Sequence, residues 1–176
     1  MKTPSDFGID VQRPGRITHV LKTAMSLTVD IQAVFAFFCN ASNLERITPP
    51  ELHFHIATPH PIQMAAGTRI DYRLCLFGIP FTWRTRISLW DPPHRFVDEQ
   101  IQGPYRLWVH NHHFFEDCGM TTIWDEVHYR LPFWPAGEIV HPAVGAQLRR
   151  IFCFRRQAIE EMLMGAQGLP SADARR

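Results

Sequence analysis

The residues best suited to chemistry are two histidines at alternate positions of one strand-like run. His110 and His112 lie between Trp108 and Phe114 in the segment 105–115. Alternate residues of a strand point to the same face, so both imidazoles share a face with the two aromatic rings. A pair at this spacing can bind a metal ion or act as general acid and base.

Carboxylates occur at matching positions of the neighbouring runs. Asp98 and Gln100 alternate on the run before the histidines, and Asp125 lies on the run after them. A buried carboxylate needs a partner, and His110 and His112 are the natural ones. Such a pair can orient a ligand carbonyl or shuttle a proton, while the alternative is a buried polar network that maintains strand register.

The spacing of the remaining metal-binding residue types argues against a metal centre. His53 and His55 form a second alternate pair, but spacing within the sequence does not fix a carboxylate or a third histidine near either pair. The four cysteines are widely scattered and form no CxxC motif. We therefore predict no metal and no cofactor, with His110, His112, Asp98 and Asp125 as the catalytic candidates if the protein is an enzyme.

One arginine falls on the apolar side of the long C-terminal segment. At 100° per residue, Arg155 lies in the middle of a stripe formed by Leu148, Ile151, Phe152, Ile159 and Met162. A buried guanidinium needs an acceptor. We consider two partners for it: a structural ion pair with Asp98 or Asp125, or the carboxylate or other polar head of a ligand.

Large apolar side chains of the alternating segments could line a pocket or simply fill the core. Together with the polar candidates they make up the predicted ligand-binding set: Tyr72, Leu74, Trp83, Asp98, Gln100, Trp108, His110, His112, Asp125, Tyr129, Ile151 and Arg155.

The elements that must position these residues follow from periodicity and breakers. Strands are predicted over 18–29, 53–57, 68–77, 81–90, 95–102, 105–115 and 121–131. Asp30 predicts the start of a short helix over 31–39, and Ser42 could cap another through 47. His141-Pro142 opens a long helix that ends near Met164, before Gly165. An antiparallel meander with one long amphipathic helix is an α+β layout.

Several short motifs, in this order along the chain, resemble one bacterial branch of the SRPBCC superfamily, which includes birch-pollen-allergen-like proteins, START domains and polyketide cyclases. They are NLERITPP (43–50), GTRIDY (67–72), WDPP (90–93), FVD (96–98), GPY (103–105), Trp108, His110, His112, DEV (125–127) and LPF (131–133), and the resemblance covers 17–163. Trp134 is bulkier than the residue expected there, so we expect the loop over the cavity mouth to differ.

The resemblance implies a helix-grip fold, in which about seven curved strands wrap around the C-terminal helix and leave a cavity. It also implies binding of a small hydrophobic or amphipathic molecule there, lipid-like or polyketide-like. The first alternative is a cyclase, dehydratase or hydrolase that uses the cavity histidines and aspartates. The second is a protein-interaction module with a filled cavity.

Bulk properties limit the remaining classes. The chain has 176 residues and a net charge of +1, which gives no electrostatic case for nucleic acid. No apolar run of about 20 residues could span a bilayer. We predict a cytoplasmic monomer or homodimer, with a flexible lead-in over 1–16, one domain over 17–165 and a flexible tail over 166–176.

Overall fold

A computed structural model describes residues 10–12 and 18–165. Its strands are β1 (Asp10–Gln12), β2 (His19–Leu27), β3 (His55–Ile56), β4 (Arg69–Leu76), β5 (Ile79–Asp91), β6 (Arg95–Gln102), β7 (Leu107–Asp117) and β8 (Met120–Arg130). Its helices are α1 (Ile31–Cys39), α2 (Ser42–Arg46), the short 3-10 turns η2 (Pro50–Leu52) and η3 (Ala136–Val140), and α3 (His141–Met164).

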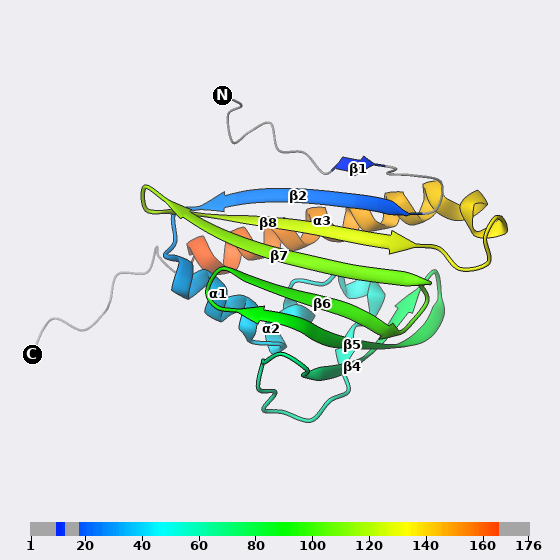
Figure 1. The fold of residues 1–176 in the computed structure, drawn as a ribbon, viewed down its shortest axis with the longest axis horizontal. Helices are drawn as coiled ribbons and strands as arrows, with labels where there is room; N and C mark the ends of the chain where they lie inside the picture. Colours follow the sequence, from blue (N-terminus) through cyan, green and yellow to red (C-terminus); the bar gives the residue numbers. More distant parts are fainter. Residues whose placement is uncertain (1–9, 13–17, 166–176) are drawn as a thin grey trace, which may run out of the picture.

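The strands form one antiparallel sheet in the order β1-β2-β8-β7-β6-β5-β4-β3. The sheet curves across one side of α3, and α1 lies beside the C-terminal end of that helix (Figure 1). This arrangement confirms the predicted α+β architecture of seven main strands, two short helices after the first of them, and a long C-terminal helix. Strand β1 is an eighth, three-residue strand that the sequence did not predict.

The short helices begin where side chains satisfy free backbone amides. The Asp30 carboxylate accepts hydrogen bonds from the amides of Gln32 and Ala33, as predicted. The predicted cap of α2 is wrong, because Ser42 is the first residue of the helix itself. The side-chain oxygen of Asn40 accepts a hydrogen bond from the Ser42 amide at 3.1 Å, so Asn40 supplies the contact that was predicted for Ser42.

Helix α3 buries the predicted stripe against the sheet. Leu148, Phe152 and Ile159 are all at least 95% buried. Ile159 belongs to a core cluster with Val34 and Phe35 of α1, whereas Leu148 and Phe152 pack on Trp108 and β8. The apolar contacts of the helix therefore divide between two ends of the sheet, and the space between them is where a cavity can form.

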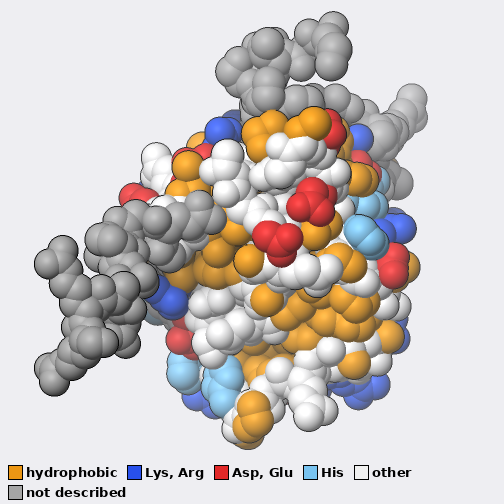
Figure 2. Space-filling model, turned by 90° about the vertical axis from the view of Figure 1, so that its left-hand side faces the viewer, with side chains coloured by type: hydrophobic (Ala, Val, Ile, Leu, Met, Phe, Trp, Pro, Cys, Tyr) orange, Lys and Arg blue, Asp and Glu red, His pale blue; other side chains and the backbone are white. Residues whose placement is uncertain are grey.

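The end of the molecule that carries α1 and the last turns of α3 presents a partly apolar face. Figure 2 shows hydrophobic side chains gathered across the middle of this face, with lysines and arginines towards its edges.

No helix among residues 18–165 is long and apolar enough to cross a membrane.

One turn differs from the prediction. The β4–β5 turn is at Phe77 and Gly78, which have φ values of 52° and 78°, so Ile79 and Pro80, which lie between the predicted strands, belong to β5. Gly103-Pro104 lies in the connection between β6 and β7, where the two predicted strands are separated. The register shifts that bend the sheet lie in the β5–β6 pair. The rest of the predicted lead-in and the tail over 166–176 lie outside the described residues.

Candidate functional site

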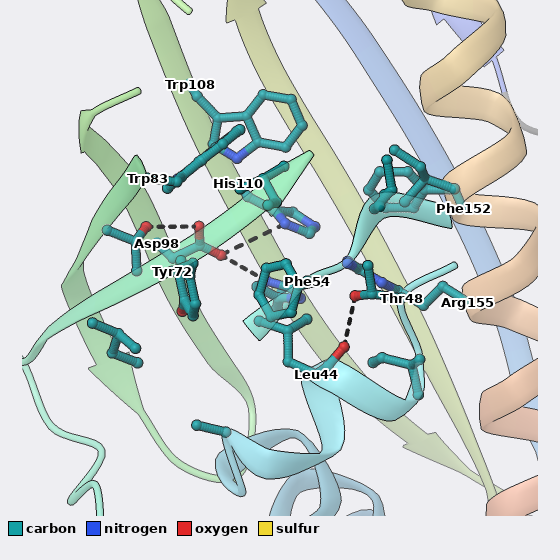
Figure 3. A pocket seen from close by; sticks show the side chains of 18 of the residues that line it. Leu44, Thr48, Phe54, Tyr72, Trp83, Asp98, Trp108, His110, Phe152 and Arg155 are labelled. Carbon is teal, nitrogen blue, oxygen red and sulfur yellow. Dashed lines mark hydrogen bonds and ion pairs between the residues drawn. The ribbon is translucent and has the colours of Figure 1, made fainter. Parts of the chain in front are cut away.

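A cavity of about 190 Å³ lies between the concave face of the sheet and α3. Figure 3 shows Asp98, His110 and Trp108 on the sheet side, with Phe152 and Arg155 on the helix side. Nine residues of the predicted ligand-binding set line it, namely Tyr72, Leu74, Trp83, Asp98, Trp108, His110, His112, Ile151 and Arg155. Most of the other lining side chains are apolar, so the polar groups stand out.

Three residues of the predicted set do not line the cavity. The Gln100 carboxamide donates to the Tyr105 carbonyl at 2.6 Å and accepts from the Tyr105 amide, so it closes the β6–β7 connection. Tyr129 is fully buried, and its hydroxyl lies 3.2 Å from Nε2 of His141, on the first turn of α3. Asp125 lies behind the two cavity histidines, where it contacts both.

Strand register brings the two histidines and two aspartates together. Asp98 of β6 is directly opposite His110 of β7, and Asp125 of β8 is directly opposite His112. Because alternate residues share a face, each carboxylate also reaches the other histidine on the diagonal. We call these four residues the His–Asp cluster.

The contacts of the His–Asp cluster form a closed ring. Asp98 Oδ2 lies 3.1 Å from His112 Nε2 and 3.6 Å from His110 Nδ1. Asp125 Oδ1 lies 3.1 Å from His110 Nε2 and 2.7 Å from His112 Nδ1, although the latter nitrogen is not aligned to donate a hydrogen bond. The predicted pairing of the acids with the histidines is therefore confirmed.

Aromatic rings hold the imidazole planes. Phe96 stacks on His112 at 4.1 Å between ring centroids, and Phe152 meets His110 edge-on at 5.6 Å. The two imidazoles themselves lie 3.7 Å apart. Rings packed on several sides restrict rotation about χ2, so the nitrogens keep their directions.

Burial and charge act against each other in this cluster. Burial by itself raises the pKa of Asp125, but the imidazoles of His112 and His110 outweigh it and hold that pKa well below its usual range. The pKa of Asp98 is lowered in the same way. Burial and the neighbouring His112 lower the pKa of His110, whereas the two carboxylates overcome burial and raise the pKa of His112.

Arg155 points into the cavity from α3 (Figure 3). Its guanidinium carbon lies 5.1 Å from the Phe152 ring centroid, and its Nε is buried without a hydrogen-bond partner. The ion-paired arginines among the described residues are Arg84, Arg86, Arg150 and Arg156.

The predicted direct ion pair of Arg155 with Asp98 or Asp125 is therefore absent from the described residues. Burial lowers the pKa of Arg155, and the more distant attraction of the two carboxylates only partly opposes this. The guanidinium keeps donor groups available to the cavity.

Sequence reasoning missed the wall that α1 and α2 contribute. Phe37, Phe38, Leu44 and Thr48 line the cavity together with Phe54 of the following loop. The Thr48 hydroxyl donates to the Leu44 carbonyl at 2.6 Å, which orders the end of α2. The only available signal was that α1 is apolar on nearly all sides, which is typical of a helix packed between two layers.

Solved structures show the same architecture, although no protein-family model and no curated protein matches the chain. TTHA0849 from Thermus thermophilus aligns with a TM-score of 0.68 at 14% identity, over 85% of this chain and 99% of that one. Major latex-like protein 151 from Panax ginseng gives a TM-score of 0.59 at 13% identity, over 88% of this chain and 100% of that one. CalU16 from Micromonospora echinospora gives a TM-score of 0.55 at 11% identity, over 91% of this chain and 88% of that one.

Identities this low establish the architecture alone. The neighbours share the long C-terminal helix, the short helices after the first main strand and the curved antiparallel sheet. The chain therefore has a helix-grip fold, as predicted.

Proposed function

We propose that the protein binds a small apolar or amphipathic molecule with an anionic group in the cavity between the sheet and α3. The observation that carries this proposal is Arg155, a guanidinium that faces an apolar cavity without an ion-pair partner among the described residues. A buried cation is costly unless it is paired, and an anionic ligand would supply the missing partner.

The volume of the cavity limits the size of the ligand. A cavity of about 150 Å³ lined by apolar residues holds benzene. The cavity here measures about 190 Å³, which suits one or two rings or a short chain. Trp83 and Trp108 meet edge to face at 5.2 Å on its wall and offer apolar contact to the ligand body.

The anionic group should add a measurable part of the affinity. A hydrogen bond between charged groups contributes about 1.5–3 kcal/mol, which corresponds to roughly 10- to 150-fold in Kd. The apolar body contributes about 25 cal/mol for each Å² of buried apolar surface, before the cost of ordering. A neutral ligand of the same shape should therefore bind, but more weakly.

The test compares 2-naphthoate with its neutral analogue 2-naphthamide, using quenching of tryptophan fluorescence. We expect wild-type protein to prefer the carboxylate. Arg155→Met keeps the length of the side chain and removes the charge, so it should weaken naphthoate binding about 10- to 100-fold and change amide binding less than about threefold.

Arg149→Gln is the matched control, because Arg149 is exposed on the outer side of the same helix and should change neither affinity. Equal losses of both ligands in Arg155→Met would contradict a role for Arg155 in recognising charge. Absence of binding of either ligand to wild-type protein would contradict a cavity open to molecules of this size.

A further inference from the structure

Besides pairing with one another, three residues of the His–Asp cluster are placed to bind a metal ion. Asp98, His110 and His112 each offer one donor atom, and the three atoms lie within 4.8 Å of one another. The absence of a third ligand was the reason to predict no metal from sequence, and strand pairing supplies that ligand. We propose that Asp98, His110 and His112 bind a divalent transition-metal ion at the wall of the cavity.

The donor distances are close to those of a metal site. Ligand atoms at about 2.0–2.2 Å from a tetrahedral zinc ion lie roughly 3.3–3.6 Å from one another. Asp98 Oδ2 already lies 3.1 Å from His112 Nε2 and 3.6 Å from His110 Nδ1. The site needs only a small inward movement of the two imidazoles.

Asp125 provides the outer support that metal-bound histidines commonly have. A bound imidazole usually donates its other N–H to a carboxylate, which sets the tautomer and the ring orientation. Asp125 Oδ1 lies 3.1 Å from His110 Nε2 and 2.7 Å from His112 Nδ1, the nitrogens that face away from Asp98. One carboxylate can therefore position both imidazoles, once the His112 ring turns slightly to align its Nδ1–H.

The remaining coordination positions would face the cavity. Asp98, His110 and His112 line it, whereas Asp125 does not. Two imidazoles and one carboxylate suit Zn²⁺, Fe²⁺ or Co²⁺ better than Mg²⁺ or Ca²⁺, which prefer all-oxygen sites. The formal charges of Asp98, Asp125, a divalent ion and Arg155 sum to +1. The site with its metal bound would therefore attract an anion. The metal proposal itself does not depend on the ligand proposed above.

Calorimetry with Zn²⁺ and full-length protein freed of metal by chelator tests the proposal. We expect one equivalent to bind with a Kd below roughly 10 µM, and His112→Gln to weaken binding at least about 100-fold. His113→Gln is the matched control, because His113 lies next to His112 on the outer face of β7 and should change the affinity less than about twofold.

Asp125→Asn tests the positioning residue. It should weaken Zn²⁺ binding about 10- to 100-fold. It should also alter the visible absorption bands of the Co²⁺ form, because the imidazoles lose the carboxylate that orients them. An unchanged Co²⁺ spectrum and affinity would leave Asp125 a purely structural role and contradict this part of the proposal.

Wild-type protein alone gives a second answer if His112→Gln does not fold. In ¹H–¹⁵N spectra of the imidazole rings, one equivalent of Zn²⁺ should shift Nδ1 of His110 and Nε2 of His112. Stoichiometric binding with shifts confined to other histidines would overturn the proposal, as would equal Zn²⁺ affinity in a folded His112→Gln protein. Absence of stoichiometric binding of both Zn²⁺ and Co²⁺ would overturn it as well.

Discussion

At the scale of single residues, two chemically identical imidazoles have pKa values shifted in opposite directions, because burial and the two carboxylates act on them unequally. His112 lies 3.1 Å from one carboxylate and 2.7 Å from the other, and its pKa is raised in spite of burial. The second carboxylate contact of His110 is longer, at 3.6 Å, and burial together with His112 lowers its pKa. His112 therefore holds a proton more readily than His110 does in the metal-free protein.

Burial has a simpler effect on a thiol near the core. It raises the pKa of the Cys39 thiol from 9.0 to about 11, so Cys39 stays protonated until the pH approaches that value. At pH 8 its thiolate fraction is roughly 0.1%. We expect iodoacetamide to label exposed Cys153 at pH 8 and to spare Cys39, as measured by peptide mass spectrometry.

The rate of Cys39 labelling should rise about tenfold for each pH unit up to about pH 11, because only the thiolate reacts. Protein unfolded in guanidinium is the control and should label at all four cysteines. Labelling of Cys39 as fast as Cys153 in folded protein at pH 8 would contradict the raised pKa of this half-buried thiol.

At the scale of elements, the β6–β7 connection sets the register on which the His–Asp cluster depends. Gln100 holds the connection by two hydrogen bonds to the backbone of Tyr105. A Cβ atom on Gly103 would lie 2.4 Å from Gln100 Oε1. The glycine is therefore needed for close approach of a side chain, and not for an unusual backbone angle.

Gly103→Ala should displace the Gln100 carboxamide and cost about 1–2 kcal/mol, the contribution of two hydrogen bonds. In a Gln100→Ala background the same substitution should cost less than about 0.5 kcal/mol, because the clash is gone. Urea unfolding of wild-type protein, the two single variants and the double variant measures the coupling free energy between Gly103 and Gln100.

Gly145→Ala is a control that should change the free energy of unfolding in the opposite direction to Gly103→Ala. Gly145 lies inside α3 with no atom within 4 Å of an added Cβ, so alanine should stabilise the helix by up to about 1 kcal/mol. Equal costs of Gly103→Ala in both backgrounds would contradict the role assigned to Gln100.

At the scale of the whole molecule, the packed core and the cavity occupy different parts of the layer between the sheet and α3. The core cluster around Phe35, Phe114, Ile123 and Ile159 fills the end next to α1. The cavity borders this cluster, the one around Leu148 and Tyr129, and a third one around Ile70 and Tyr72, but Phe35, Phe114, Ile123 and Ile159 do not line it. Stability and binding should therefore respond to different substitutions.

Ile159→Ala should lower the free energy of unfolding by about 2–5 kcal/mol and leave 2-naphthoate affinity unchanged, because Ile159 is 98% buried and does not line the cavity. Leu74→Ala should instead weaken naphthoate binding about 5- to 30-fold. Its effect on stability should be smaller, since its side chain borders an existing cavity. Urea unfolding and fluorescence titration measure the two effects, and a loss of affinity in folded Ile159→Ala would contradict the separation.

The local periodicity of the sequence determined which faces of the strands and of α3 point into the protein. Alternation along 105–115 predicted that His110 and His112 share an inward face, and both are at least 95% buried. The 3.6-residue stripe predicted which side of α3 meets the sheet and placed Arg155 on it. These features depend on residues close together in the chain, where the geometry of one strand or one helix dictates direction.

Tertiary structure alone decided how these faces combine. Asp98, His112 and Asp125 come from three strands and meet because two strand registers align, and register depends on loops and on long-range backbone pairing. The same pairing turned Gln100 to a loop and placed Asp125 behind the histidines. Arg155 lacks an ion-pair partner among the described residues because α3 crosses the sheet at a distance that leaves a cavity, and that spacing follows from how all the layers pack.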